Sequence, residues 1–299
     1  MLKVENVTKY YGDFKAVDNL SFTVGDGEIF GLLGANGAGK TTTFRMIIGL
    51  LDKTEGSITL DGKKIDYSMT DNIGFLTEER SLLLKLTVKE QVIYYGILKG
   101  LDEKTCIERL DYWLKRFHIE NYKEKKIKEL SKGNQQKIQF ITAIINNPKL
   151  LILDEPFSGL DPVNAEQFMD VIRELKKSGT SIIFSSHRME SVELFCEKLV
   201  ILVHGKSVLE GSLKDIKKAY RKKNIHIKAD VDPKKLEGVK GVVAVIKNAD
   251  DILVKISEEE YINDVFNEVK KCKNVVEFRV EDPSLNEIFI DHVGVKYEN

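Results

Sequence analysis

Alternating apolar and polar positions characterise the first part of the chain. From residue 1 to about 60, short alternating stretches are separated by turns rich in glycine and aspartate, which predicts a small sheet. Between them, EIFGLLGANGAGKTTTFRMIIGL combines an apolar strand, a glycine loop and a helical pattern. Further along, KLLILDEP and TSIIFSSH are short, fully apolar strands that flank a helical segment. Strands buried on both faces are typical of a parallel sheet, so we expect an α/β core.

Capping residues show where several helices begin. Thr87, with Glu90 three residues later, forms a capping box at the start of TVKEQVIYYGILKGL. Residues 103–128 continue with helical periodicity and many charges, which predicts a separate helical lobe. Ser131 is suited to cap the helix that follows in LSKGNQQK, and Asp161 the helix between the two apolar strands.

The last quarter of the chain has a pattern of its own. From about residue 225, the order of elements is strand, helix, strand, strand, helix, strand and a final helix, PSLNEIFIDHV. This predicts a main domain at residues 1–215, a basic linker at 216–224 and a small α+β domain at 225–299. A chain of 299 residues is long enough for both domains.

Composition and net charge limit the kinds of molecule and compartment that we expect for this chain. Apolar residues make up 42% of the chain and charged residues 31%, as in ordinary globular proteins. The net charge of −1 provides no global field for nucleic acid, so we expect no nucleic-acid partner. Three isolated cysteines fit a reducing compartment. No run reaches the ~18 apolar residues that span a bilayer, and the start lacks a signal peptide, which together predict a cytoplasmic chain.

The stretch GANGAGKT, at residues 34–41, matches the phosphate-binding pattern G-x-x-x-x-G-K-[ST] between a strand and a helix. Its glycines allow backbone amides to surround phosphates, Lys40 can reach the β- and γ-phosphates, and the Thr41 hydroxyl can bind Mg²⁺. The residues expected to contact the nucleotide here are Gly34, Ala35, Asn36, Gly37, Ala38, Gly39, Lys40, Thr41 and Thr42.

Acidic residues and a histidine follow the two apolar strands. Asp154 ends LLILD at the carboxyl edge of the sheet, where ligands bind in such folds, and is expected to hold Mg²⁺. Glu155 follows it and can act as a base on water. His187 closes TSIIFSSH and is expected to contact the γ-phosphate. The alternative is that these groups only end strands.

Together the motifs resemble the nucleotide-binding subunit of an ATP-binding cassette (ABC) transporter. In family order they are an aromatic residue near the start, the phosphate loop, LSKGNQQK, the acid-ended strand, the SGLD turn and the terminal histidine, spanning residues 1 to about 215. The resemblance implies a P-loop ATPase core, with a mixed sheet, an antiparallel N-terminal subdomain and a helical lobe. It implies binding of ATP and Mg²⁺, and hydrolysis with Glu155, His187 and Lys40 as catalytic residues.

Rival classes fit the sequence less well. A DNA-repair relative would need a coiled-coil insertion between the phosphate loop and LSKGNQQK, and a translation-associated relative would carry two cassettes. If the chain were a small-molecule kinase, Glu155, LSKGNQQK and His187 would have no role. A sensor or regulatory subunit that binds ATP without transport remains the alternative function.

In the resembled family, two subunits meet head to tail in the ATP-bound state. The resemblance therefore implies a homodimer or paired cassette, in which Ser131, Gly133 and Asn134 bind the γ-phosphate on the partner's phosphate loop. Tyr11, in KYYG, matches the aromatic residue that stacks on adenine. Tyr10 could exchange roles with it, or Tyr11 could pack in the core.

Three positions depart from the usual family pattern. Lys132 and Asn134 stand where glycine and glutamine are usual, and a lysine there either helps bind phosphate or faces solvent. Glu78, in IGFLTEER, stands where most members carry a glutamine that touches Mg²⁺ and the attacking water. Some bacterial export-type subunits share this glutamate, so we expect Glu78 to be a metal ligand.

Hydrolysis without a membrane span implies a separate transmembrane permease. We expect it to dock around residues 79–100, where Leu82, Leu83 and Leu84 either leave apolar surface exposed or pack inside. Association through the permease would place the chain peripherally on the inner face of the cell membrane. The C-terminal segment resembles an accessory domain of sodium- or multidrug-export-type subunits, which favours an exporter of drugs, peptides or ions.

Overall fold

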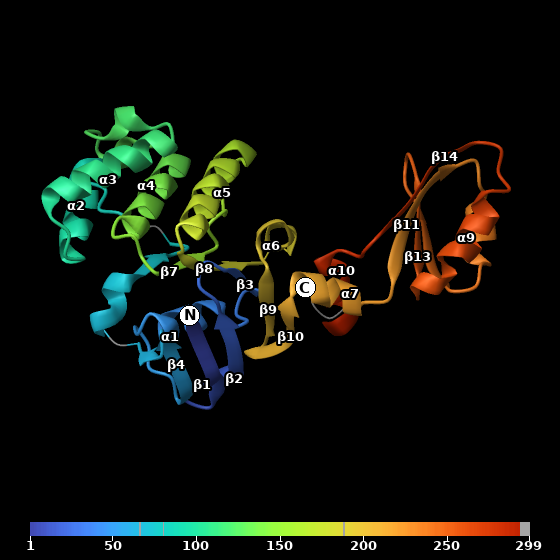
Figure 1. Ribbon diagram of the computed structural model, residues 1–299, viewed down its shortest axis with the longest axis horizontal. Helices are drawn as coiled ribbons and strands as arrows, with labels where there is room; N and C mark the ends of the chain where they lie inside the picture. Colours follow the sequence, from blue (N-terminus) through green and yellow to red (C-terminus); the bar gives the residue numbers. More distant parts are fainter. Residues whose placement is uncertain (66, 80, 188, 294–299) are drawn as a thin grey trace. The chain divides into compact units, whose positions relative to one another are not determined.

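The structure is a computed structural model that describes residues 1–65, 67–79, 81–187 and 189–293. Two predicted regions extend beyond this part of the chain. The predicted C-terminal domain includes residues 294–299, and the predicted docking segment includes Arg80, and both lie outside the described residues. The chain is divided into two compact units, Met1–Glu210 and Gly211–Asn299 (Figure 1).

The central sheet of the first unit has six strands in the order β10-β9-β3-β8-β7-β6. The neighbouring pairs β3–β8, β3–β9, β7–β8 and β6–β7 are all parallel. Every residue of β3, β7 and β8 is buried, which confirms the predicted parallel α/β core. The strands are β3 (Ile29–Leu33), β6 (Ile73–Leu76), β7 (Leu150–Asp154), β8 (Ser181–Ser186), β9 (Lys198–Val203) and β10 (Lys206–Ser212).

A second sheet, in the order β2-β1-β4-β5, forms the predicted antiparallel N-terminal subdomain. Its buried face and the central sheet share one apolar core, which includes Val4, Phe44 and Ile152. Phe22 stacks on Phe30 at a ring-centroid distance of 4.9 Å, so the two sheets are in direct contact. The elements are β1 (Leu2–Tyr11), β2 (Phe14–Val24), β4 (Glu55–Leu60), β5 (Lys63–Lys64) and the helix α1 (Lys40–Ile47).

Helices α2, α3 and α4 form the helical lobe, which lies together in one part of Figure 1. The rings of Phe117, Phe140 and Phe168 pack against one another and join the lobe to α5. The predicted caps at Thr87, Ser131 and Asp161 are all present. The elements are η1 (Tyr67–Asn72), α2 (Val88–Leu98), α3 (Glu103–Arg116), η2 (Glu120–Tyr122), η3 (Ile127–Glu129), α4 (Lys132–Ile144), α5 (Pro162–Lys177) and α6 (Met189–Phe195).

The second unit is a four-stranded antiparallel sheet in the order β12-β13-β11-β14. With α8 and α9 inserted between strands, its β-α-β-β-α-β order is that of a ferredoxin-like fold. Ile225, Val254 and Val265 belong to its own apolar core. The elements are α7 (Leu213–Ala219), β11 (Lys223–Ala229), α8 (Pro233–Glu237), β12 (Val242–Lys247), β13 (Ile252–Ile256), η4 (Glu259–Tyr261), α9 (Ile262–Val269), β14 (Val275–Glu281) and α10 (Leu285–Val293).

The division between the units lies after Glu210, whereas the sequence analysis placed it after residue 215. The segment predicted as a linker, 216–224, contains most of α7 and the first residues of β11. Ser212 caps α7 by accepting the backbone N–H of Asp215, and the first part of the predicted linker is therefore helical. Within the described residues, no helix is both long and apolar enough to pass through a bilayer.

Candidate active site

The phosphate loop connects the end of β3 to the start of α1. Gly37 and Gly39 have φ angles of 80° and 104°, in the left-handed region that side chains rarely adopt. A Cβ atom at Gly39 would also lie 2.7 Å from the carbonyl oxygen of Ala16. These positions therefore require glycine, and the loop brings its backbone to the edge of the central sheet, ahead of the amino end of α1.

Lys40 is a buried cation at this loop, with 6% of its surface exposed. Its ammonium donates hydrogen bonds to the carbonyl oxygens of Gly34, at 2.6 Å, and Ala35, at 3.2 Å. It also lies 3.9 Å from the Glu155 carboxylate. Burial lowers the pKa of Lys40, while the charges of Glu155, Asp154 and Glu78 oppose that shift. The geometry thus fixes a positive charge beside the loop amides, where phosphate oxygens would be bound.

Asp154, the buried last residue of β7, joins the phosphate loop to the centre of the sheet. Thr41 Oγ1 donates to Asp154 Oδ2 at 3.1 Å across a sequence separation of 113 residues. Ser185 Oγ donates to the other carboxylate oxygen at 2.5 Å and accepts the Glu155 N–H at 3.0 Å. Carboxylate and hydroxyl oxygens are the hard ligands that Mg²⁺ prefers, so the donor set of Thr41 and Asp154 fits that ion.

Glu155 and His187 meet at the same edge of the sheet. The Glu155 side chain is buried, and His187 Nδ1 lies 2.8 Å from its Oε1. Glu155 has a φ of 49°, a left-handed conformation that costs a non-glycine residue about 1–2 kcal/mol. Backbone strain of this kind concentrates at functional sites. A buried carboxylate held by a histidine can accept a proton from water.

A cavity of about 410 Å³ is lined by Glu155, whereas His187 is not among its lining residues. Tyr11 and Phe14 lie opposite each other where β1 meets β2, and both line it. Tyr10 is not among its lining residues and instead contacts the Lys15 ammonium, which favours Tyr11 as the stacking residue. The lining residues are Tyr11, Phe14, Ala16, Ala35, Asn36, Gly37, Ala38, Gly39, Lys40, Thr41, Thr42, Glu78, Asp154 and Glu155.

The residues predicted to act on a partner's nucleotide lie elsewhere. Ser131 is exposed at the start of α4 and accepts the backbone N–H of Asn134 at 3.4 Å. A Cβ atom at Gly133 would lie 3.5 Å from the side-chain nitrogen of Asn164, which places Gly133 beside the start of α5. Ser131, Gly133 and Asn134 do not line the 410 Å³ cavity of their own chain.

Glu78 lies just after β6 and lines the cavity together with Thr41 and Asp154. The loop around it is held by Gln139 on α4, a buried amide that the sequence analysis did not identify. Its nitrogen donates to the carbonyl oxygen of Thr77 at 3.1 Å, to the Thr77 hydroxyl at 3.0 Å and to the carbonyl oxygen of Glu79 at 3.2 Å. Gln139 therefore positions the Glu78 loop from the helix that begins at Ser131.

Two families match the chain, one in each unit. The family described as ABC transporter matches residues 17–158, and the family described as ATP-binding protein DrrA1-3-like, C-terminal domain, matches residues 211–293. The uncharacterized ABC transporter ATP-binding protein YhaQ of Bacillus subtilis (strain 168) is 49% identical over 298 residues, which cover 100% of both chains.

The chain belongs to the ATP-binding subunits of ABC transporters. Members of this family bind ATP and hydrolyse it. The linearmycin resistance ATP-binding protein LnrL of Bacillus subtilis (strain 168) is 34% identical, with 72% of this chain and 70% of that protein covered. The dimeric structure of MJ0796, a bacterial ABC transporter cassette, has a TM-score of 0.66 at 27% identity and covers 71% of this chain and 99% of that one.

The contacts of Gln139 generate a prediction about this ABC ATPase. In Gln139→Leu, the carbonyl groups of Thr77 and Glu79 lose their donor, which should cost about 1–3 kcal/mol in the free energy of unfolding. Because the Glu78 loop is then no longer held, we expect kcat for ATP hydrolysis to fall more than ATP affinity. Steady-state kinetics, ATP titration and denaturant unfolding measure the three quantities.

Gln91→Leu provides the matched control. Gln91 is also a buried amide, on α2, and its oxygen accepts the backbone N–H of Leu83 at 2.7 Å instead of binding Thr77 or Glu79. We expect this variant to lose stability without the selective loss of kcat. A purely structural role for Gln139 would be indicated if both variants changed the kinetics alike.

Proposed function

We propose that the chain is the Mg²⁺-dependent ATPase subunit of an ABC exporter and powers a separate transmembrane permease. The observation that carries this proposal is the hydrogen bond between Thr41 and Asp154, which joins the phosphate loop to the strand that also bears Glu155. Those groups lie in one cavity with Lys40. The relative LnrL is named for linearmycin resistance, which supports export of drug-like molecules as the task.

Nucleotide binding follows from the lining of the cavity. Adenine would stack on Tyr11, with the exposed ring of Phe14 beside it, since aromatic faces bind bases without specific hydrogen bonds. The phosphates would be bound by the loop amides and Lys40. Thr41, Asp154 and Glu78 would hold Mg²⁺, which supplies neutralisation of the charge on the β- and γ-phosphate oxygens.

The chemical step would use the residues at the edge of β7 and β8. Glu155 accepts the proton of the attacking water, and its carboxylate is oriented by the contact with His187. Lys40 stabilises negative charge that develops on the transferred phosphoryl group. Because Asp154 and Glu155 are adjacent in the chain, the distance between the proposed metal site and the proposed base would be held nearly constant.

A complete site would require a second chain. Ser131, Gly133 and Asn134 lie at the amino end of the 13-residue helix α4, a geometry that binds anions through free backbone amides. The dimeric cassette structure of MJ0796 supports a paired arrangement. In such a pair, this helix end would meet the partner's γ-phosphate. The exposed side chain of Lys132 would add positive charge there.

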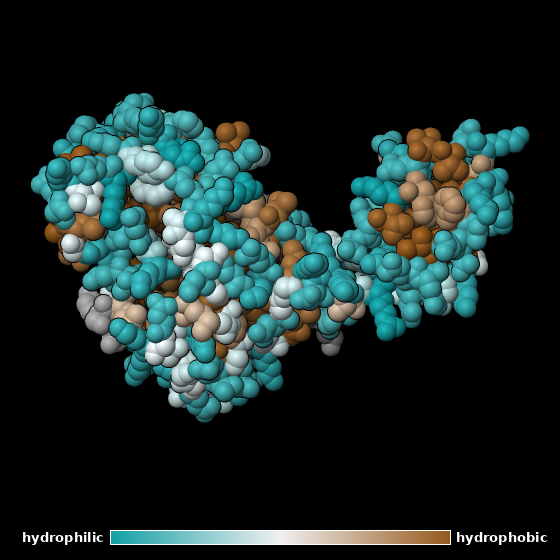
Figure 2. Space-filling model, in the orientation of Figure 1, coloured by the Kyte–Doolittle hydropathy of each residue, from teal (hydrophilic) through white to brown (hydrophobic). Residues whose placement is uncertain are grey.

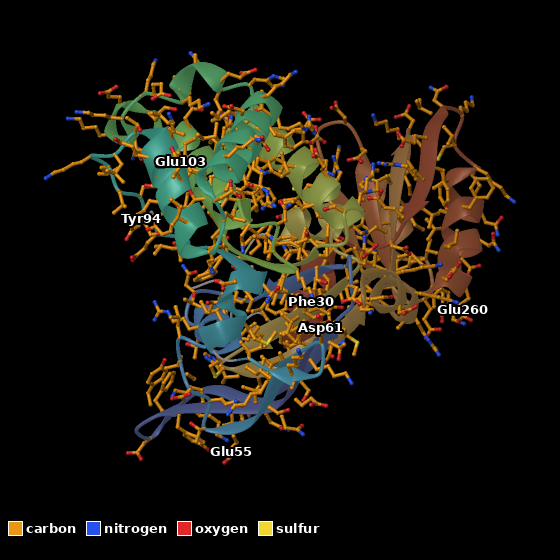
Figure 3. The ribbon with its side chains drawn as sticks, turned by 60° about the vertical axis from the view of Figure 1, so that its left-hand side comes forward. Phe30, Glu55, Asp61, Tyr94, Glu103 and Glu260 are labelled. Carbon is orange, nitrogen blue, oxygen red and sulfur yellow. The ribbon has the colours of Figure 1, made fainter. Side chains whose placement is uncertain are left out.

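The permease would dock on the helical lobe. Leu83 and Leu84 are exposed, whereas Leu82 is half-buried, so the apolar surface considered from the sequence is present. On α2, Tyr94, Ile97 and Leu98 are also exposed (Tyr94 is labelled in Figure 3). A surface of this kind marks an interaction site. Binding there would hold the chain peripherally at the inner face of the membrane.

The first test uses Glu155→Gln. Removing the base should lower ATP turnover by about 10²–10⁴-fold while ATP still binds. Because bound ATP is then retained, the cassette faces should pair when Mg-ATP is added, so the dimer should persist to lower protein concentrations than it does without nucleotide. ATP turnover assays and light scattering give the two readouts. Turnover at the wild-type rate would refute the role of Glu155.

A second prediction concerns the hydroxyl of Ser185. In Ser185→Ala, Asp154 loses a hydrogen bond and the buried N–H of Glu155 loses its acceptor. We expect the Mg²⁺ concentration that supports half-maximal ATPase activity to rise several-fold, because Asp154 is less firmly placed. Ser181→Ala, at the other end of β8, removes a hydrogen bond to Gly25 and is the control. Equal Mg²⁺ titrations for both variants would contradict the assignment.

A third prediction tests the docking surface. Leu83→Glu should lower the fraction of the chain bound to native membranes by about tenfold or more, because a leucine buried at an interface contributes about 1.5–3 kcal/mol. Leu194→Glu places the same charge at another exposed leucine, on α6, and should leave the fraction unchanged. Membrane flotation measures this, and equal losses for both variants would rule out docking at Leu83.

A further inference from the structure

The second unit has apolar side chains on its surface, gathered on the face seen in Figure 2. Its sheet ends at β14 on one side, and in the described part of the chain no strand pairs with the outer edge of β14. Val276 and Val280 of this strand are exposed, with 80% of Val276 accessible, and so is Phe266 on the neighbouring helix α9. Exposed edge strands are templates for pairing, and lysine and proline are among the residues that protect them, together with other charged side chains and bulges. β14 carries neither lysine nor proline.

The sequence of β14 is complementary to itself. Its centre reads Val276-Glu277-Phe278-Arg279-Val280. In an antiparallel pair centred on Phe278, Glu277 of one chain lies opposite Arg279 of the other, and the same contact recurs by symmetry. Opposite charges in directly facing positions stabilise antiparallel strands, and like charges destabilise them. A shift of the centre to Arg279 would place Glu277 opposite Glu281, so the charges select the first register.

The apolar positions agree with the same register. The two Phe278 residues would face each other at the centre, with Val280 of each chain on the same face of the joined sheet. Phe278 already contacts Phe266, with ring centroids 5.1 Å apart. Pairing would therefore bury a row of apolar side chains that is exposed in a single chain.

The other edge of the sheet lacks these features. Strand β12, with the sequence VVAVIK, has no acidic residue to balance Lys247 in a symmetric pair. A bulge also interrupts its register with β13, between Val242 and Ala244 at the start of the strand. β14 has its bulge at Val276, where it leaves Glu277 to Glu281 in regular register with β11.

We propose that the chain forms a homodimer in which the outer edge of β14 pairs with β14 of a second copy of the chain. The pairing is antiparallel and two-fold symmetric about Phe278, and it joins the two four-stranded sheets into one continuous sheet. It needs no nucleotide, in contrast to the pairing proposed for the cassettes, and it keeps two subunits together when ATP is not bound.

The test uses the full-length chain without nucleotide, in analytical ultracentrifugation over a concentration series. The wild-type chain should form a dimer. Glu277→Arg sets arginine against Arg279 twice, and Arg279→Glu sets glutamate against Glu277 twice, so each variant should dimerise about tenfold more weakly or worse.

A mixture of the two variants decides between pairing and simple damage to the fold. In the mixed pair, both arginines of the first chain face both glutamates of the second, so the heterodimer should form as tightly as the wild-type dimer. Loss of intrachain contacts, such as the 3.1 Å ion pair of Arg279 with Glu277, cannot be repaired by mixing. A wild-type chain that stays monomeric at all concentrations, or variants that mixing does not restore, would overturn the proposal.

Discussion

The site depends on the balance of charge around Lys40, a buried ammonium between the phosphate loop and two buried carboxylates. A charge removed from water is tolerated only where opposite charge or hydrogen bonds compensate for the lost hydration. Here the compensation comes from the carbonyl oxygens of Gly34 and Ala35 and from the Glu155 carboxylate. Because the compensating groups follow two different strands, β3 and β7, the central sheet must assemble correctly before the cation can be accommodated.

The parallel sheet supplies the geometry that this balance requires. The strands β3, β7 and β8 all end at the same edge, so the phosphate loop, Asp154 and His187 meet although they are far apart in the sequence. Each strand is buried along its whole length, and the polar side chains of the site lie at the carboxyl ends of the strands or just after them. Ligand binding is thereby confined to one rim of the core.

The motifs that the sequence predicted are those with a strong local signal. The glycine loop, the acid-ended strand and the helix caps each depend on residues within a few positions of one another. The order of helices and strands in both units could be predicted because each element also has its own local pattern. Ser185, Gln139 and Phe14 were missed because their roles arise from contacts that no short pattern encodes. Ser185 acts on Asp154 from 31 residues away, and Gln139 contacts Thr77 from 62 residues away.

Helix α4 could couple the two ATP sites of a pair of chains. Ser131 caps its amino end and is suited to bind a partner's phosphate. Gln139, in the middle of the helix, donates hydrogen bonds to the loop that carries Glu78 in its own cavity. A helix of this length behaves as a rigid rod on the scale of such contacts. Occupancy of one cavity that displaces the Glu78 loop would therefore tilt the rod that contacts the other cavity. In the proposed pair of chains, the two α4 helices would therefore couple ATP binding at one site to the geometry of the other.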